Sequence, residues 1–378
     1  MVRRICIYCQ TWESGGIEAF IYNILTHMEI SGLEIDIVVE VQKESVFTNR
    51  LKARGIRFRE LSGSHRRPTE NYRRFAKLMG EQRYDVLHLN VFQALQLSYL
   101  HLAKKLGIPV RIAHSHNTML RRSKTRVLKM GIHKIARMLF AGDATEFWAC
   151  SQDAADFLFP AQLIGKRGCR VVPNGIALQR FQFNAAERLA VRKRLHLENA
   201  FVVGNVGRLC QQKNQKFLLE VFGQVHAAES TARLLLVGEG EMLTELQKEA
   251  ARLSLDDVVI FYGTSTRVEE LLWAMDVFVF PSIFEGLGIV AIEAQAAGLP
   301  TICSDRVPQE AFASRLAKRL PLLERAGQWA QTILNEKGNR GAGEEIEQLS
   351  QRGFEIADVG RSVEMIYRTG PTGRQIER

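Results

Sequence analysis

The chain has 378 residues, of which 46% are hydrophobic and 24% charged; this length suits two domains of roughly 100–200 residues each, and the composition excludes a disordered chain. The formal net charge of +10 is concentrated in residues 1–140, which hold 24 Lys and Arg against 11 Asp and Glu. A basic half of this kind favours an anionic partner for that half.

No segment approaches the ~20 consecutive apolar residues that a membrane-spanning helix needs, and residues 1–9 are too short for a signal peptide. We therefore expect a cytoplasmic protein that can contact the plasma membrane peripherally from its inner face. The six cysteines are scattered and are expected to be reduced. Cys6 and Cys9 form a C-x-x-C pair, but their apolar run predicts a buried strand, whereas a redox-active thiol needs a helix N-terminus.

In chain order, short β-branched segments alternate with helix-like segments, which predicts doubly wound α/β sheets with buried parallel strands. Eleven segments are predicted as strands, in two series: 4–8, 34–39, 86–89, 110–113, 146–149 and 170–172, then 201–205, 233–237, 258–262, 277–280 and 301–303. The two series separate near residues 173–183. We expect two Rossmann-like domains facing across a cleft, residues 1–178 and 179–359, with a C-terminal helix at about 360–378 packing back on the first.

Ligands of such sheets bind at the carboxyl ends of the strands, so the connections that follow strands are the candidate sites. The first connection contains Gly15 and Gly16. It lacks the G-x-G-x-x-G spacing of a dinucleotide fingerprint, which disfavours a dehydrogenase. Two glycines at this turn still allow a substrate to approach the backbone.

His114 and His116 end a predicted strand of the first domain. Metal sites need three or four ligands, and no acidic or cysteine partner lies nearby in the sequence, so we expect no metal. Two interpretations of each histidine stay open: a hydrogen-bonding or catalytic group at the cleft, or a structural one.

The segment Arg121–Arg137 predicts a basic amphipathic helix. Its charges suit docking on anionic lipid, although a packed helix with a solvated basic face has the same pattern. Nucleic acid is disfavoured because no recognised binding motif accompanies the charge. The segment combines basic and apolar residues: Arg121, Arg122, Lys124, Arg126, Lys129, Lys134 and Arg137 with Val127, Leu128, Ile135, Leu139 and Phe140.

The second domain carries two phosphate-binding candidates. Its first strand is followed by Gly207, which allows a tight turn, and by Arg208 and Lys213, whose charges suit a diphosphate. A later strand is followed by residues 282–294, in which a glycine-containing turn opens a helix and favours an anion at its N-terminus. This turn contains Glu285, Gly286, Leu287 and Gly288, and the helix contains Glu293. An ordinary strand–turn–helix with solvated glutamates is the alternative interpretation.

Together these segments resemble glycosyltransferase family 4, a retaining family with the two-domain GT-B architecture, over roughly residues 5–310. The strongest matches are residues 284–294 and 207–214, supported by Pro173-Asn174-Gly175-Ile176 and Gly238-Glu239-Gly240. Residues 113–118 are most similar to the bacterial capsular and exopolysaccharide branch. The sequence departs from the family at Ala177, where an Asp is frequent, and little is recognised after Glu310.

The resemblance implies roles by position. Arg208 and Lys213 would bind the donor diphosphate, and Glu293 would hold the ribose hydroxyls. Glu285 and the backbone of Gly286–Gly288 would meet the donor sugar and phosphate, and His116 would contact the sugar near the reacting carbon. Gly15 and Gly16 would lie beneath the donor, with Gly238 in a further donor-side turn. No metal and no cofactor other than the nucleotide-sugar donor are expected.

The expected function is retaining transfer of a hexosyl group from a nucleotide-sugar, with UDP favoured, to a glycan acceptor that is lipid-linked, in bacterial surface polysaccharide synthesis. Cationic side chains and a helix N-terminus would stabilise the departing diphosphate in place of a divalent ion. Two alternatives remain on the same architecture: a nucleotide-sugar epimerase and a catalytically silent partner subunit. The sequence leaves open the donor base and sugar, the acceptor and the oligomeric state.

Overall fold

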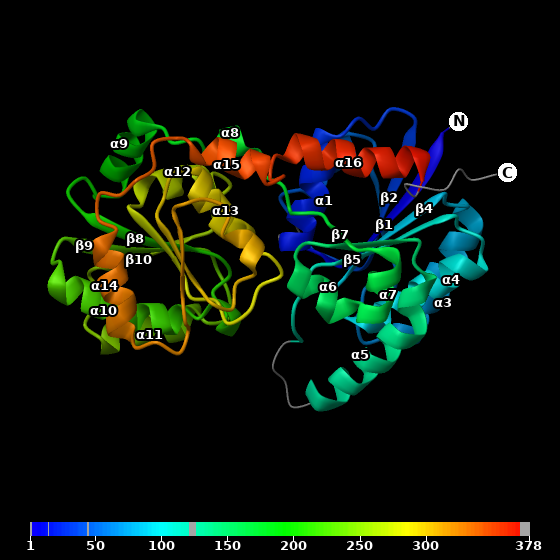
Figure 1. The fold of residues 1–378 in the computed structure, drawn as a ribbon, viewed down its shortest axis with the longest axis horizontal. Coiled ribbons are helices and arrows are strands. Elements are labelled where there is room, and N and C mark those ends of the chain that lie inside the picture. The colour runs from blue at the N-terminus through cyan, green and yellow to red at the C-terminus, as the bar shows by residue number, and fades with distance from the viewer. Residues whose placement is uncertain (1, 14, 44, 121–125, 371–378) are drawn as a thin grey trace. The chain divides into compact units, whose positions relative to one another are not determined.

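The computed structural model describes residues 2–13, 15–43, 45–120 and 126–370 (Figure 1). The chain forms two compact units, Met1–Ile176 with Phe354–Arg378, and Ala177–Gly353. The chain therefore crosses between units after residues 176 and 353, slightly before the expected 178 and 359. The crossings are paired: the Ile176 N–H donates to the Phe354 carbonyl at 2.9 Å, and the Ile356 N–H donates back to the Ile176 carbonyl at 3.0 Å.

Unit 1 is built on a seven-stranded parallel sheet of order β3-β2-β1-β4-β5-β6-β7. Because the order reverses between β1 and β4, the topological switch point lies between these two strands. Its strands are β1(Arg3–Trp12), β2(Leu33–Gln42), β3(Arg57–Glu60), β4(Val86–Val91), β5(Val110–Ser115), β6(Glu146–Ala149) and β7(Arg170–Val171). Its helices are α1(Gly16–His27), α2(Thr48–Ala53), α3(Pro68–Gln82), η1(Ala94–Leu97), α4(Ser98–Lys105), α5(Arg126–Phe140), η2(Ala141–Asp143), α6(Gln152–Leu158), α7(Ala161–Arg167) and α16(Ile356–Thr369).

Unit 2 repeats the architecture with a six-stranded parallel sheet of order β10-β9-β8-β11-β12-β13, whose switch point lies between β8 and β11. Its strands are β8(Phe201–Val206), β9(Ala232–Val237), β10(Val259–Gly263), β11(Val277–Phe280), β12(Thr301–Ser304) and β13(Ala317–Leu320). Its helices are α8(Leu178–Phe181), α9(Ala185–Arg194), η3(Gln211–Lys213), α10(Gln215–Ala228), α11(Leu243–Arg252), α12(Val268–Ala274), α13(Ile289–Ala296), η4(Gln309–Ala311), α14(Ala326–Asn335) and α15(Glu345–Gln351).

Two edge strands were not predicted from the sequence. β3 reads Arg-Phe-Arg-Glu and β13 reads Ala-Lys-Arg-Leu, so neither has an apolar run. β3 is held by charge instead, because Arg57 and Arg59 both pair with the buried carboxylate of Asp36 on β2, at 2.5 and 3.2 Å. Edge strands tolerate such residues because one side of the ladder faces solvent.

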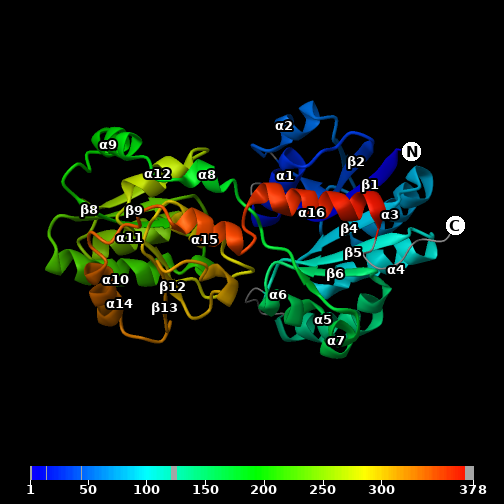
Figure 2. The same cartoon turned by 45° about the horizontal axis from the view of Figure 1, so that its top comes forward.

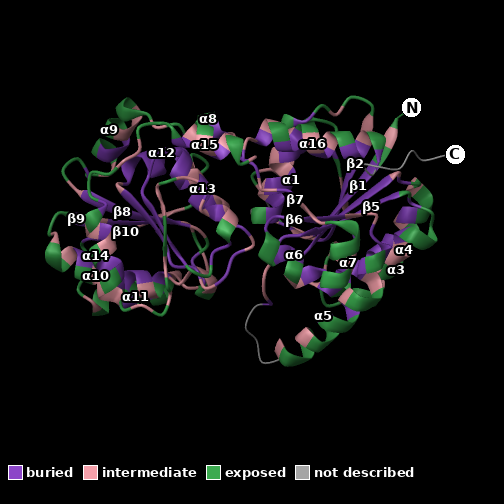
Figure 3. Cartoon of the chain, in the orientation of Figure 1, coloured by how far each residue is buried: buried purple, intermediate pink, exposed green. Residues whose placement is uncertain are grey.

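Burial follows the layers of each unit, with buried sheets between helices that expose one face (Figure 3). Cys6 and Cys9 are buried in β1, and burial raises the pKa of both thiols well above the usual value, as expected for structural cysteines. The C-terminal helix α16 lies along α1 in unit 1 (Figure 2). No helix in the described part of the chain is long and apolar enough to cross a membrane.

Candidate active site

The two phosphate-binding candidates of unit 2 leave the sheet at its switch point. β8 and β11 are neighbours in the sheet, so the connection that carries Lys213 and the connection that carries Glu285 begin side by side. The Lys213 ammonium lies 2.7 Å from a Glu285 carboxylate oxygen and 4.6 Å from the centre of the Phe280 ring. Both charged side chains are largely shielded from solvent, so this pair is a fixed feature of the site. Arg208 is exposed in the same connection as Lys213.

Three hydrogen bonds hold these two connections together. The Gln212 side chain donates to the Phe284 carbonyl at 2.9 Å, and the Ile283 N–H donates to the Gln212 carbonyl at 2.8 Å. Asn214 donates to the Pro281 carbonyl at 3.1 Å from a left-handed backbone with φ of 58°. Sequence reasoning did not assign roles to Gln212 and Asn214, because their partners lie about 70 residues away in the chain.

A third connection, after β9, packs on the first through glycine. Gly238 has φ of +134°, and a Cβ at this position would lie 2.1 Å from the Gly207 carbonyl oxygen. The Leu209 N–H donates to the Glu239 carbonyl at 2.9 Å. No larger residue fits at Gly238, so its role is to bring two backbone segments into contact at the carboxyl edge of the sheet.

The remaining loop residues lead into α13. Gly288 precedes this helix with φ of +85°, in the left-handed region that favours glycine. Leu287 is buried and Gly286 is half-buried. The backbone therefore delivers the positive end of α13 close to Lys213 and Glu285, which is an arrangement that suits an anionic ligand.

Glu293 lies further along α13 and has different surroundings. Burial raises its pKa from the usual 4.5 to about 7, nearby Glu269 raises it further, and Arg180 opposes the shift. Arg180 and Glu269 form a 2.8 Å ion pair with each other. The structure thus places Glu285 beside a lysine and Glu293 beside a carboxylate, and sequence spacing carried no signal for Arg180 or Glu269.

In unit 1, the Gly15–Gly16 turn and His116 lie near each other. Gly15 precedes α1 and Gly16 begins it. The ring of Phe20, one turn into α1, lies 5.2 Å from the His116 ring, which follows β5. A Cβ at Gly16 would meet no atom within 4 Å, so packing within the chain does not require glycine there.

The tautomer of His116 is set by Asn90. The Asn90 amide donates to the Tyr8 carbonyl at 3.2 Å, so its oxygen is left to accept from His116 Nε2 at 2.8 Å. The other nitrogen, Nδ1, is buried and has no partner among the described residues. Burial lowers the pKa of His116 to about 3. His116 is therefore neutral, and its Nδ1 can accept a hydrogen bond from a hydroxyl.

His114 belongs to a buried chain of hydrogen bonds. Tyr367 on α16 lies 2.6 Å from His88 Nδ1, and His88 Nε2 lies 3.1 Å from His114 Nδ1. Burial lowers the pKa of both His88 and His114. The structure thus favours the structural interpretation for His114, whereas His116 lies one step closer to the edge of the sheet. No group of three or more His, Cys, Asp or Glu side chains suited to a metal occurs among the residues described.

The basic segment forms α5 from Arg126 onward, and residues 121–125 lie outside the described part of the chain. Only His133 and Ala136 of this helix are buried. The helix exposes an unusual number of apolar side chains: Val127 (87%), Leu128 (66%), Ile132 (42%), Ile135 (62%), Met138 (78%) and Leu139 (65%). At helical spacing these residues share one side, with Lys129 and Lys134 at its borders.

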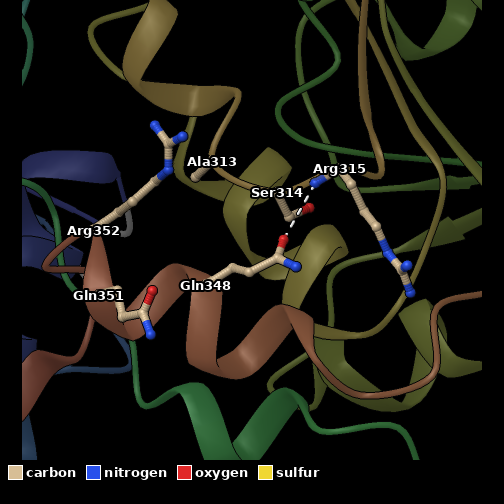
Figure 4. A pocket seen from close by; sticks show the side chains of 6 residues that line it. All are labelled: Ala313, Ser314, Arg315, Gln348, Gln351 and Arg352. Atoms are coloured by element: carbon tan, nitrogen blue, oxygen red, sulfur yellow. Dashed lines mark hydrogen bonds between the residues drawn. The ribbon is translucent and has the colours of Figure 1, made fainter.

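A surface pocket of about 230 Å³ in unit 2 is separate from these groups (Figure 4). The backbone N–H of Arg315 donates to the Gln348 side chain across it at 3.3 Å. It is lined by Ala313, Ser314, Arg315, Gln348, Gln351 and Arg352. None of these is a predicted site residue, so the pocket is not part of the candidate site at the switch point of unit 2.

Comparison with known proteins identifies two family models that together cover most of the chain. Residues 14–180 match the model described as Glycosyltransferase Family 4, and residues 187–313 match the model described as Glycosyl transferases group 1. A Bacillus subtilis (strain 168) protein named as glycosyltransferase EpsF is 31% identical over 339 residues, covering 88% of this chain and 87% of that protein.

Two further comparisons are informative. The Escherichia coli enzyme named UDP-Gal:alpha-D-GlcNAc-diphosphoundecaprenol alpha-1,3-galactosyltransferase is 25% identical over 237 residues, covering 61% of this chain and 60% of that enzyme. The crystal structure of Anabaena Alr3699/HepE in complex with UDP-glucose superposes with a TM-score of 0.77 at 19% identity, covering 96% of this chain and 98% of that one. The second comparison establishes a shared fold.

Proposed function

The chain belongs to glycosyltransferase family 4, whose members are retaining, metal-independent enzymes of GT-B fold, and on this premise we propose that it transfers a hexosyl group from a UDP-sugar to a lipid-linked glycan acceptor in bacterial surface polysaccharide synthesis. The related galactosyltransferase acts from UDP-Gal on a diphosphoundecaprenol-linked sugar, as its name states. The Anabaena structure holds UDP-glucose. Both support the choice of UDP, and the galactosyltransferase alone supports a lipid-linked acceptor.

The observation that carries the proposal is the Lys213–Glu285 pair at the switch point of unit 2. In doubly wound sheets ligands bind at this point, and here it combines an ammonium, an exposed guanidinium from Arg208 and a helix N-terminus. When the bond from sugar to diphosphate breaks, negative charge develops on the leaving nucleotide. Arg208, Lys213 and the backbone at Gly286–Gly288 would stabilise that charge. Glu285 would orient Lys213 and meet the donor sugar.

The remaining residues receive roles from the resemblance to the family. Glu293 would accept hydrogen bonds from the ribose hydroxyls, and Gly238 would hold the donor-side loops together. In unit 1, Gly15 and Gly16 would allow the donor to lie against the backbone. Because its lowered pKa makes His116 a weak base, we assign it a hydrogen-bonding contact with a sugar hydroxyl near the reacting carbon and not the role of a general base.

The test is thermal unfolding of the whole chain against UDP-, GDP- and ADP-sugars with EDTA present. A ligand that binds the folded state raises the midpoint by mass action. We expect a shift with the UDP series alone, lost in Arg208→Ala and Glu293→Ala and retained in Arg233→Ala, a half-buried arginine on β9 of the same unit. Shifts with another base would overturn the UDP assignment. Transfer only when an acceptor is added separates a transferase from an epimerase, and binding without turnover would indicate a silent subunit.

We further propose that α5 docks on anionic lipid at the cytoplasmic face of the membrane, which would bring the enzyme to a lipid-linked acceptor. Its exposed apolar side would enter the lipid interface while Lys129 and Lys134 meet phosphate headgroups. Replacing Leu128, Ile135 and Met138 with serine should abolish sedimentation with vesicles of anionic phosphatidylglycerol. Serine at the exposed Leu189 and Leu323 of unit 2 is the control. Equal sedimentation of the wild type with neutral and anionic vesicles would refute the docking proposal.

A further inference from the structure

A second group of hydrogen-bonded polar side chains lies at the carboxyl edge of the unit 1 sheet. Its residues belong neither to the sequence motifs nor to the proposed donor site. His65 Nδ1 lies 2.9 Å from a carboxylate oxygen of Glu40, and His65 Nε2 lies 3.0 Å from the Thr11 hydroxyl. Glu40 is near the end of β2, Thr11 is near the end of β1, and His65 lies in the segment between β3 and α3. Three separate segments thus meet in a chain of carboxylate, imidazole and hydroxyl.

The protonation pattern of this chain follows from Glu40. Its side chain is buried, and it accepts from the Tyr8 hydroxyl at 2.8 Å, the Tyr99 hydroxyl at 3.4 Å and the Gln10 amide at 3.3 Å. A carboxylate only accepts, so His65 Nδ1 must donate to it. In the neutral imidazole, Nε2 then carries the lone pair and accepts from the Thr11 hydroxyl. The His65 ring itself is exposed to solvent.

Stability alone does not account for this arrangement. A buried carboxylate costs free energy unless it is well paired, and none of the described partners of Glu40 is a Lys or an Arg. Unit 1 contains a comparable pair, His101 and Asp143 at 2.8 Å, but there Lys104 also binds the carboxylate and the pair precedes β6. That pair lies at the amino edge of the sheet. The hydrogen-bond chain from Glu40 ends at Thr11, near the carboxyl end of β1. This strand borders the switch point, where ligands of doubly wound sheets bind.

An exposed aromatic ring adjoins the cluster. Tyr72 on α3 stacks on Tyr99, with ring centres 6.0 Å apart and planes 16° apart, and Tyr99 donates to Glu40. The preceding residue, Asn71, accepts from Ser62 N–H at 3.0 Å and donates to the Ser64 carbonyl at 2.9 Å. The segment that carries His65 is therefore tied to the helix that carries Tyr72. An aromatic face beside hydrogen-bonding groups suits a sugar ring, which has both apolar C–H and hydroxyl surfaces.

We propose that Thr11, Glu40, His65 and Tyr72 form a subsite for the acceptor glycan. His65 Nε2 accepts a hydrogen bond from a sugar hydroxyl that takes the place of the Thr11 hydroxyl, and Tyr72 packs on the sugar ring. Glu40 is a positioning residue that fixes the His65 tautomer. This inference rests on the proposed transfer to a glycan and assigns the part of unit 1 that would recognise it.

The first test needs no known acceptor. Imidazole ¹⁵N chemical shifts of His65 are followed by NMR in the whole chain, while α- and β-methyl glycosides of glucose, galactose and their N-acetyl forms are added at up to about 100 mM. At least one glycoside should move the His65 Nε2 signal while His101 stays constant, and the effect should vanish in Tyr72→Ala. No movement with any glycoside, or equal movement of His65 and His101, overturns the inference.

The second test uses the glycoside that shifts His65 most, as acceptor with UDP-glucose and UDP-galactose. His65→Ala and Glu40→Gln should each raise the acceptor KM at least tenfold with less than a threefold change in kcat. Glu40→Gln acts because its amide can donate to Nδ1 and move the ring proton to Nε2. The matched control, His101→Ala, should leave the acceptor KM within twofold. An unchanged KM in His65→Ala overturns the subsite while the transferase proposal stands. Absence of a thermal shift with every nucleotide-sugar tested on the wild type would instead refute the transferase proposal.

Discussion

At the residue scale, the two glutamates of the proposed donor site differ in how their charges are compensated. Glu285 is paired with Lys213 at 2.7 Å, whereas Glu293 is half-buried, and its desolvation together with the nearby Glu269 raises its pKa to about 7. A folded protein that disfavours an ionised carboxylate loses stability as pH rises through the interval between the unfolded and folded pKa values. Glu293 therefore costs stability above pH 7, which is the expected signature of a group kept for binding.

Substituting Glu293 tests whether this side chain lowers the stability of the protein and is needed for binding. In Glu293→Gln the group no longer ionises, so the ligand-free protein at pH 8 should gain up to about 2 kcal/mol relative to wild type, and the gain should shrink as pH falls from 7 to about 4.5. The variant should at the same time lose the UDP-sugar thermal shift. Chemical denaturation at pH 5 and pH 8 measures the first effect. A destabilised variant at pH 8 would contradict the assigned pKa direction.

The Lys213–Glu285 pair makes the opposite prediction. Lys213→Met removes the ammonium that pairs with a buried carboxylate, so unit 2 should lose about 3 kcal/mol. The double variant Lys213→Met/Glu285→Gln should recover most of that loss, because no buried charge remains, yet stay inactive. Equilibrium unfolding of the two single variants and the double variant gives the coupling free energy. Additive losses would show that the two side chains do not stabilise each other.

At the scale of elements, strand order decides which loops can form a site. The strand order reverses between β8 and β11, so the connection that carries Lys213 lies beside the connection that carries Glu285. The close contact at Gly238 brings the connection after β9 against the first of these. The corresponding reversal in unit 1 lies between β1 and β4, where the Gly15–Gly16 turn follows one strand. The glycines of the two units differ in what requires them. Packing within the chain requires glycine at position 238, whereas a Cβ at Gly16 would meet no atom within 4 Å.

Alanine at these two glycines separates folding from binding. Gly238→Ala would place a methyl group against the Gly207 carbonyl and should destabilise unit 2 by about 2–4 kcal/mol. Gly16→Ala begins a helix with a better helix former and should leave the unfolding midpoint equal or slightly higher. If the donor lies against this turn, Gly16→Ala should nevertheless weaken the UDP-glucose thermal shift. An undiminished shift would remove Gly16 from the donor site.

At the scale of the whole molecule, the chain returns to unit 1 after building unit 2. The α16 helix buries Val363, Ile366 and Tyr367 in unit 1, and a Cβ at Gly360 would lie 3.3 Å from the His27 backbone of α1. The last described segment of the chain is therefore part of the first core. Tyr367 also completes the hydrogen-bond chain through His88, which links α16 to the strand that precedes His116.

Calorimetry should show this connectivity. We expect two unfolding transitions, of which UDP-glucose raises the one that belongs to unit 2. Ile366→Ser should lower only the other transition, by about 10 °C, because it opens the unit 1 core. Met365→Ser is the control, since Met365 is next to Ile366 in the chain but is 45% exposed. If Ile366→Ser lowers the nucleotide-sensitive transition instead, the assignment of α16 to unit 1 is wrong.

The sequence by itself determined the fold class, the family and the connections that carry the proposed donor residues. This was possible because buried parallel strands are apolar runs and because glycines and charges at strand ends are local features. The roles of the individual residues are still predictions. The edge strands β3 and β13 escaped notice because charged residues at a sheet edge leave no apolar pattern.

Only the tertiary structure decided which distant residues meet. The contact of Lys213 with Glu285, the control of His116 by Asn90 and the chain from Glu40 through His65 to Thr11 all depend on strand order and register, which bring carboxyl ends together regardless of separation in the chain. The pKa of Glu293 likewise depends on Glu269 and Arg180 from other elements. Burial and neighbouring charge are properties of packing, so the one-dimensional pattern of the sequence does not contain them.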